Sequence, residues 1–281
     1  MTLTFAVIIK PFNDHQRKYT DLAIKGLINQ GLKYIGTFTM NTAMPLPKAD
    51  FYITWSLKLH QKNTHWEALA KSGKPIMVLE RGFLGNRENW LMVGWNGINN
   101  RADYCNKSIT NNSRFSQFQH LMKPWNPVKN NIVLITGQLP WDTTVSNVNI
   151  HEWYDKTIKE LINKGKQVWY RPHPLLDRQP YHNNLIAKYI TQEPLETTLE
   201  HVSACVTYSS NSGVSAMLQG IPATCADEYS MIWNIARHDL EDLNYQPDRE
   251  QWAAQLAYCQ WNLKEIENGD FWTTLKKKLI L

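Results

Sequence analysis

Residues 208–224 read YSSNSGVSAMLQGIPAT and begin at the end of a short apolar run, residues 205–208. The run predicts a buried strand, residues 213–219 predict a helix, and residues 222–225 predict a further short strand. A Ser/Asn/Gly-rich turn that opens a helix offers backbone N–H groups, hydroxyl donors and the positive end of the helix dipole, which suit a phosphate or diphosphate. An ordinary helix cap is the alternative interpretation, because Ser and Asn are preferred there.

Two other segments also follow predicted strands. Residues 136–138 (TGQ) follow the apolar run at 132–135, and residues 171–174 (RPHP) follow the run at 167–170. The carboxyl ends of parallel strands meet at one edge of a sheet, so all three segments are expected to lie together. A histidine between two prolines is fixed in direction and can donate to phosphate, although a lone histidine is more often structural. The predicted phosphate-binding residues are Gly137, Gln138, Arg171, His173, Ser209, Ser210, Ser212 and Gly213.

Short apolar runs alternate with amphipathic helical patterns in both halves of the chain, which favours parallel sheets covered by helices. Residues 123–131 (KPWNPVKNN) contain two prolines and little periodicity, which is typical of a linker near residue 127. We therefore predict an α/β chain of two domains, residues 1–125 and residues 126–281, in which the last helix can pack back on the N-terminal domain. Ligands of such sheets bind beyond the carboxyl ends of the strands, so two facing domains would enclose a cleft.

The alternation breaks at residues 80–116, which open with ERGFLGNRENWLMVGWNGINNRADY. A loop this long inside a compact chain is usually functional or disordered, and its aromatic content argues against disorder. Arginine, tryptophan and asparagine are common where a protein binds a sugar or a nucleic acid. The same residues would also serve to brace the protein around a site. The predicted acceptor-binding residues are Arg81, Arg87, Trp90, Trp95, Asn96 and Arg101.

The motif at residues 208–224, together with RPHP, resembles the C-terminal domain of GT-B glycosyltransferases, above all the bacterial capsule-type Kdo transferases and related polysaccharide enzymes. The shared pattern is S-S-x-x-G-x-x-A-x-x-x-G-x-P, which runs here from Ser209 to Pro222. The resemblance covers about residues 132–230 and is shared in part by epimerases of the same architecture. It implies a GT-B-like fold of two Rossmann-type domains. It also implies that the C-terminal domain binds a nucleotide-activated sugar, with a UDP-sugar expected. Glu228 and Asp227 lie where such enzymes often hold the ribose or base, and a solvated turn is the alternative interpretation of these two residues.

The segment E-R-G-x-x-G-x-R followed by G-W-N-G-x-N-x-R-A-D is similar to a segment of phage-encoded proteins of glycosyltransferase type. Such enzymes glycosylate hydroxymethylated pyrimidines in phage DNA. Arginine would hold backbone phosphate, and an aromatic ring would stack on a flipped base. This resemblance implies double-stranded DNA with modified bases as acceptor. The alternatives are a capsule or surface polysaccharide as acceptor, a nucleotide-sugar epimerase, and a non-catalytic protein that binds DNA or carbohydrate.

An inverting transferase needs a general base for the acceptor hydroxyl and positive or dipolar groups for the leaving diphosphate. The base is expected in the N-terminal half. Glu80 directly follows the strand predicted at 76–79 and is the first choice, Asp14 is the second, and Asp103 is the third. Each of the three carboxylates has an ion pair with arginine as its alternative role. The chain has no Asp-x-Asp motif, which argues against the metal-binding arrangement of the GT-A glycosyltransferase fold. A metal-independent enzyme without a cofactor is expected, and the sequence leaves the use of a divalent metal open.

Composition excludes several classes of protein. The chain has 281 residues, a formal net charge of +5 and 43% hydrophobic residues, so it can bury a core and is not disordered. No apolar run is long enough to span a bilayer, and the N-terminus lacks a signal-peptide pattern. The four cysteines form no zinc-binding spacing and are expected to be buried thiols in a reducing cytoplasm. The chain is rich in tryptophan, and in the helices expected at residues 249–267 and 271–279 these side chains are predicted to pack.

Overall fold

The computed structural model describes residues 2–10, 13–39, 45–58, 60–62, 64–125, 129–176, 187–190 and 193–280. The chain forms two compact units. Unit 1 comprises Met1–Phe115 and Ala253–Leu281, and unit 2 comprises Ser116–Trp252. The predicted linker around residue 127 lies outside the described residues. The C-terminal segment that the prediction assigned to the second domain, apart from the last helix, belongs to unit 1 from residue 253 onward.

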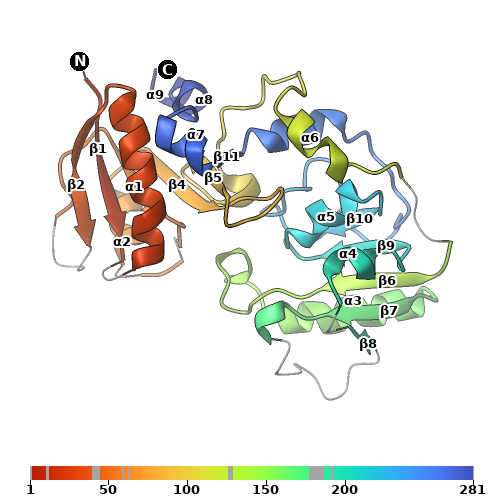
Figure 1. Cartoon of the computed structure of the whole chain (residues 1–281). Coiled ribbons are helices and arrows are strands. Elements are labelled where there is room, and N and C mark those ends of the chain that lie inside the picture. The colour runs from red at the N-terminus through yellow and green to blue at the C-terminus, as the bar shows by residue number, and fades with distance from the viewer. Residues whose placement is uncertain are drawn as a thin grey trace. The chain divides into compact units, whose positions relative to one another are not determined.

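Unit 1 is built on a six-stranded sheet in the order β11-β5-β4-β3-β1-β2 (Figure 1). Strands β1 to β4 are parallel, whereas β5 and β11 run antiparallel to their neighbours. Apolar runs form β1, β3, β4 and β5, which are almost entirely buried, as expected for strands covered on both faces, whereas the edge strand β2 has no fully buried residue. The strand bounds are β1 (Thr4–Ile9), β2 (Lys33–Thr39), β3 (Phe51–Trp55), β4 (Ile76–Arg81), β5 (Trp90–Trp95) and β11 (Gln260–Asn262).

The predicted loop at residues 80–116 is wrong in its first part, because β4 and β5 form an antiparallel hairpin there. Arg81 pairs with Leu91 and Met77 pairs with Trp95. Hence β5 begins at the carboxyl edge of the parallel strands and ends at their amino edge. The run WLMVGW is a nearly continuous buried strand, and only Trp90 of its six residues is not fully buried.

The helices of unit 1 pack an N-terminal and a C-terminal segment together. Helix α1 (Asp14–Asn29) lies beside α7 (Leu263–Asn268), as Figure 1 shows. Asn13 caps α1 by accepting from the Gln16 N–H at 2.9 Å. The single helix predicted for residues 249–267 is wrong, because β11 interrupts it. The other helices of this unit are α2 (His65–Lys71), α8 (Trp272–Leu275), α9 (Lys277–Ile280) and the 3-10 turn η1 (Asn99–Arg101).

Unit 2 is built on a five-stranded, all-parallel sheet in the order β10-β9-β6-β7-β8. From the central β6, the chain first adds β7 and β8 on one side and later adds β9 and β10 on the other. The strand order therefore reverses between β6 and β9, which is the point where ligands of such sheets bind. The strand bounds are β6 (Ile132–Thr136), β7 (Gln167–Arg171), β8 (Lys188–Tyr189), β9 (Ala204–Thr207) and β10 (Ala223–Cys225).

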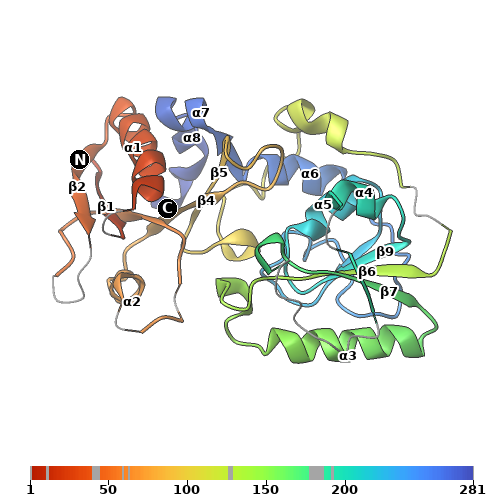
Figure 2. The ribbon, with the colours of Figure 1, turned by 60° about the horizontal axis from the view of Figure 1, so that its bottom comes forward.

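Helices cover both faces of the sheet in unit 2. Figure 2 shows α3 on one face and α4 and α5 on the other. Arg249 closes this unit by donating to the Met217 and Lys123 carbonyls and by stacking on Trp125, with Cζ 3.8 Å from the ring centroid. Helix α6 (Glu250–Ala257) crosses from unit 2 into unit 1 along the sequence. The remaining elements are α3 (Ile150–Asn163), α4 (Leu195–Leu199), α5 (Ser212–Leu218) and the 3-10 turns η2 (Phe115–Leu121), η3 (Thr143–Val145) and η4 (Pro174–Leu176).

The contact between α1 and α7 yields a testable prediction at Gly26. A Cβ atom at Gly26 would lie 2.1 Å from the Ile266 carbonyl oxygen and 2.8 Å from the Gly269 nitrogen. Gly26→Ala is therefore expected to destabilise the protein by roughly 1–3 kcal/mol through overpacking, although alanine is the better helix former. Urea unfolding measures this effect. Asp21→Ala, at an exposed position of the same helix, is the control, and a stabilised Gly26→Ala protein would refute the packing of α7 on α1.

Candidate functional site

The carboxyl edge of the unit 2 sheet joins the loops that follow β6 and β9. The Ser209 N–H donates to Gln138 Oε1 at 2.8 Å, and Gln138 Nε2 donates to Ser209 Oγ and to Thr144 Oγ1, each at 3.0 Å. Gln138 and Ser209 are 7% and 3% exposed, respectively. Their polar groups are thus engaged with each other inside the protein. They hold the two loops in register at the point where the strand order reverses.

Three hydroxyl groups lie together at this same edge. Ser212 Oγ lies 2.7 Å from Thr136 Oγ1 and 2.8 Å from Ser210 Oγ. Ser210 and Ser212 are half-buried, so they face solvent in part. The Ser212 N–H, at the start of α5, donates to Ser210 Oγ at 3.3 Å. Thr136 was not among the predicted binding residues, although its position as the last residue of β6 could have indicated it.

Two of the predicted glycines are required by packing. A Cβ atom at Gly137 would lie 2.8 Å from the Tyr170 hydroxyl and 3.0 Å from Pro172 Cα, so glycine lets β7 end close to the loop after β6. A Cβ atom at Gly213 would lie 2.9 Å from Ile232 Cδ1. Both glycines shape the edge, and neither offers a side chain to a ligand.

The end of β7 and the loop after it bring a guanidinium, from Arg171, and an imidazole, from His173, to the edge. His173 Nδ1 accepts from the Leu175 N–H at 3.2 Å, so the neutral ring carries its proton on Nε2 and can donate there. Arg171 Nη1 donates to Thr198 Oγ1 on α4 at 3.5 Å, and the Arg171 carbonyl accepts from the Gly137 N–H at 2.7 Å. Both side chains are half-buried. The RPHP segment is thus tied by its backbone to the loop after β6.

The turn after β10 carries the predicted Glu228, which is exposed. Its neighbour Asp227 accepts from the Tyr229 N–H at 2.9 Å and from the Tyr208 hydroxyl at 3.5 Å. A cavity of about 210 Å³ lies beside this turn, between α3 and the ends of β9 and β10. Its lining includes Trp153, Val206, Thr224, Ala226, His238 and Asp239.

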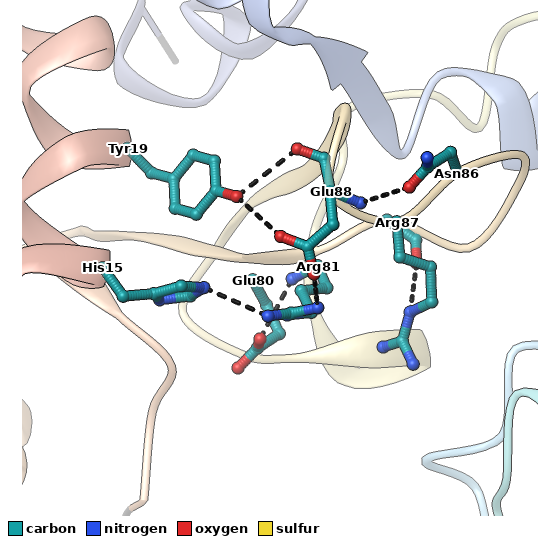
Figure 3. A network of polar contacts seen from close by, with 8 residues as sticks. His15, Tyr19, Glu80, Arg81, Asn86, Arg87 and Glu88 are labelled. Atoms are coloured by element: carbon teal, nitrogen blue, oxygen red, sulfur yellow. Dashed lines mark hydrogen bonds and ion pairs between the residues drawn. The ribbon is translucent and has the colours of Figure 1, made fainter.

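The carboxyl edge of the unit 1 sheet carries a second polar network, which Figure 3 shows. Arg81 forms an ion pair with Glu88, and its Nη2 lies 3.3 Å from His15 Nε2. The Tyr19 hydroxyl donates to Glu88 Oε2 at 3.2 Å. Glu80, the first choice for a general base, accepts from the Arg81 N–H at 3.0 Å. The predicted carboxylate therefore lies next to a network that sequence reasoning did not identify.

His15 and Tyr19 lie one helical turn apart at the start of α1, and this i, i+4 spacing is the signal that could have paired them. The rings also contact Trp55 at the end of β3, with centroid distances of 4.8 Å for His15 and 5.3 Å for Tyr19. Burial, followed by the charge of Arg81, lowers the pKa of His15 below its ordinary value. Asp14 precedes His15 in the same first turn and is exposed.

The predicted acceptor residues do not form one surface. Because β5 runs antiparallel to β4, its first residue, Trp90, lies at the carboxyl edge and its last residue, Trp95, lies at the amino edge. Trp95 is fully buried and donates to the Leu275 carbonyl at 2.9 Å, so its predicted stacking on a ligand is corrected to core packing. Asn96 closes the amino-edge turn by accepting from the Ile76 N–H at 2.8 Å, and Arg101 follows in η1.

Asp103 also lies at the amino edge, paired with Trp95 in an isolated bridge. It forms an ion pair with Lys278 at 2.8 Å and accepts from the Cys105 N–H at 3.0 Å. Partial burial alone would raise the pKa of Asp103, but the Lys278 and Cys105 hydrogen bonds outweigh it and lower this pKa. A carboxylate with a lowered pKa is a weak base. Asp103 pairs with the end of β5, whereas Glu80 pairs near its start, so the two carboxylates lie at opposite edges of the sheet.

Arg87 and Trp90 stay near the carboxyl edge of unit 1. Arg87 is exposed, and its Nε donates to the Gly82 carbonyl at 3.2 Å. Trp90 is half-buried, and the Arg114 guanidinium lies 5.8 Å from its ring centroid. Of the six predicted acceptor residues, Arg81, Arg87 and Trp90 therefore share one edge of the sheet.

Within the part of the chain that the structure describes, no group of three His, Cys, Asp or Glu residues could hold a metal ion. No helix among the described residues is both long and apolar enough to cross a membrane.

Comparison with known proteins identifies the fold but no family. No protein-family model matches the sequence, and no curated protein does either. The chain is similar in structure to Thermosulfurimonas dismutans KpsC, solved as a β-Kdo 2,7-transferase, with a TM-score of 0.60, 15% identity, and coverage of 92% of this chain and 90% of that one. A β-Kdo 2,4-transferase structure of the same KpsC gives a TM-score of 0.58 at the same identity and coverage.

A Methanocaldococcus jannaschii UDP-GlcNAc 2-epimerase matches at 10% identity over 95% of this chain and 93% of that one, but its TM-score of 0.34 supports no conclusion. At 15% identity, the KpsC matches establish the fold alone. The predicted α/β class, GT-B-like with two Rossmann-type domains, is confirmed.

Gln138 was predicted to bind the ligand, but its hydrogen bonds to Ser209 and Thr144 indicate that it stabilises the fold. Gln138→Ala removes the acceptor of the buried Ser209 N–H and two donated hydrogen bonds, so we expect a loss of about 2–4 kcal/mol in unfolding free energy. Chemical denaturation measures this loss. Asn147→Ala, at an exposed position nearby, is the control and should change stability by less than about 0.5 kcal/mol. A Gln138→Ala protein of unchanged stability would contradict the assignment.

Proposed function

We propose that the protein is a glycosyltransferase that moves a sugar from a nucleotide-sugar donor to a hydroxyl acceptor. The observation that carries this proposal is the hydroxyl cluster of Thr136, Ser210 and Ser212 at the point where the unit 2 strand order reverses. His173 approaches the same edge from the neighbouring β7. The KpsC transferases, which share the fold, make sugar transfer the natural chemistry to test.

The donor would bind in unit 2 through its diphosphate or phosphate. Hydroxyl groups and the His173 Nε2–H are neutral donors, and Arg171 adds a positive charge two residues away. These groups would stabilise the negative charge that develops as the bond between the anomeric carbon and the phosphate oxygen breaks. The 210 Å³ cavity beside the turn after β10 has the aromatic side chains Trp153 and His238, which would suit a nucleoside. Glu228, exposed on the same turn, would then contact the ribose. A UDP-sugar is the first donor to test.

The acceptor would bind to unit 1, where a carboxylate takes the proton of the attacking hydroxyl. Glu80 remains the first choice for this base, because it is the penultimate residue of β4, at the carboxyl edge beside the Arg81 network. Asp14 is the second choice at the same edge. A metal-independent mechanism and a cytoplasmic location stay predictions.

For the acceptor itself, hydroxymethylpyrimidine DNA and a surface polysaccharide remain the two candidates. Arg81, Arg87 and Trp90 support a DNA acceptor, because basic and aromatic groups share one edge of the sheet. The core position of Trp95 removes part of that support. Sugar transfer to hydroxymethylcytosine DNA, hydroxymethyluracil DNA and unmodified DNA decides the question. Transfer to neither modified duplex would exclude the DNA acceptor.

Donor binding predicts a specific effect at His173. His173→Ala is expected to weaken nucleotide-sugar binding by about tenfold or more, because a hydrogen bond to a charged phosphate is lost. Thermal shift and calorimetric titration with UDP-, CMP- and GDP-sugars measure the effect, since a ligand that binds only the folded state raises its stability.

His201→Ala provides the matched control. This histidine is exposed and lies just before β9, at the amino edge of the same sheet. Unchanged donor affinity in His173→Ala would place the phosphate elsewhere. If the unaltered protein binds none of these nucleotide sugars and hydrolyses none slowly, the transferase proposal itself fails.

The base assignment predicts that Glu80→Gln lowers kcat by roughly 100-fold or more while donor affinity is unchanged, since general base catalysis contributes about that much. Single-turnover transfer rates provide the measurement. Asp103→Asn, at the amino edge, should retain the rate. A full rate in Glu80→Gln together with a loss in Asp14→Asn would move the base to Asp14.

A further inference from the structure

A basic cluster at the carboxyl edge of the unit 1 sheet is separate from the Arg81 network. Lys10 follows β1, and Lys58 lies three residues after β3, the strand that pairs with β1. The Nζ atoms of Lys10 and Lys58 lie 5.2 Å and 6.0 Å from the ring centroid of Trp66 on α2. His65 contacts the same ring at a centroid distance of 4.0 Å. We call Lys10, Lys58, His65 and Trp66 the basic cluster.

The position of this cluster in the topology is that of a ligand site. From β1 the chain crosses through α1 to β2 on one side, and from β3 it crosses through α2 to β4 on the other. The strand order therefore reverses between β1 and β3, where ligands of open parallel sheets bind. Unit 2 has its hydroxyl cluster at the equivalent point, between β6 and β9.

The backbone at the end of β3 is fixed in an unusual conformation. Ser56 has φ of 58°, a left-handed conformation that is uncommon for a residue other than glycine. Trp66 Nε1 donates to the Ser56 carbonyl at 3.2 Å. The indole ring that gathers the two lysines is therefore anchored to the strand end.

The charges of the cluster are not balanced by a carboxylate. Among the described residues, neither Lys10 nor Lys58 forms an ion pair, and no partner accepts from or donates to the ring nitrogens of His65. His65 is only 8% exposed, and burial, followed by the charge of Lys10, lowers its pKa to about 4. One lysine over an indole ring is stabilising, but a second like charge at the same ring opposes the first unless an anion lies between them.

We propose that the basic cluster binds one anionic group, a carboxylate or phosphate, of the acceptor, and that this acceptor is an acidic saccharide. The assignment to the acceptor rests on the proposed transferase function, whereas the anion site itself does not. A duplex DNA acceptor requires phosphate contacts spread along the backbone. Two lysines around one ring, beside a largely buried imidazole, form a compact site for a single anion.

The test uses the full chain and the histidine side-chain NMR signals. The chain has nine histidines, and His65→Gln identifies the His65 signal. Methyl β-glucuronide and inorganic phosphate are the anionic probes, and methyl β-glucoside is the neutral match. We expect both anions to shift the His65 signal in a saturable way and the neutral glucoside to leave it unchanged.

Lysine variants connect the signal to the cluster. Lys10→Ala and Lys58→Ala should each weaken glucuronide binding by about tenfold, as expected when a hydrogen bond to a charged group is lost, and Lys58→Arg should retain it. Lys33→Ala, which removes an exposed lysine at the amino edge, is the matched control. Thermal unfolding verifies that each variant is folded.

An unshifted His65 signal, an equal shift with the neutral glucoside, or an equal loss in Lys33→Ala would overturn the anion site. A short DNA duplex that shifts His65 and binds with a steep salt dependence, while the glucuronide does not, would overturn the saccharide acceptor. Titration of the same samples with nucleotide sugars tests the proposed transferase function separately from the proposed anion site. Saturable anion binding without nucleotide-sugar binding would refute the transferase and leave the anion site standing.

Discussion

In a parallel sheet every strand delivers the residues that follow it to the same edge, and this constraint governs both units. It places the loops after β6, β7 and β9 together in unit 2, and the segments after β1, β3 and β4 together in unit 1. Where the strand order reverses, the two flanking loops turn away to opposite faces and leave an opening. The hydroxyl cluster and the basic cluster lie at these two reversals.

The sequence predicted this arrangement wherever an apolar run was followed by a distinctive polar segment. TGQ, RPHP and SSNSG all lie at the edge expected of them, because parallel strands leave no freedom about which edge they reach. Prediction failed at β5, where Gly and Asn around a short run suggested a loop. Only the pairing of β5 with β4 reveals that the chain reverses, and pairing depends on a partner outside the local sequence. The reversal then carried Trp95, Asn96, Arg101 and Asp103 to the opposite edge.

A second limit concerns polar residues whose edge of the sheet was predicted but whose contacts with each other were not. Gln138 and Ser209 lie at the predicted edge, yet they are buried and bonded to each other. A glutamine or serine that supports a loop and one that contacts a ligand need the same hydrogen-bonding groups, so composition cannot distinguish them. Burial distinguishes them, and it depends on how neighbouring loops pack. Thr136, at the end of β6, is also buried, and it reaches the half-buried Ser210 and Ser212 only through its hydrogen bond with Ser212 Oγ.

The histidines at the two edges can act as neutral hydrogen-bond donors in a chain whose net charge is only +5. Burial lowers the pKa of His15 and of His65, and the Leu175 N–H fixes the proton of neutral His173 on Nε2. A neutral imidazole donates a hydrogen bond without the desolvation cost of a buried charge. The positive charge is supplied by Lys10, Lys58 and Arg171, whose long side chains remain at least partly in water. In the proposed transferase, this separation of donor and charge would let each edge hold an anion and release it once per turnover.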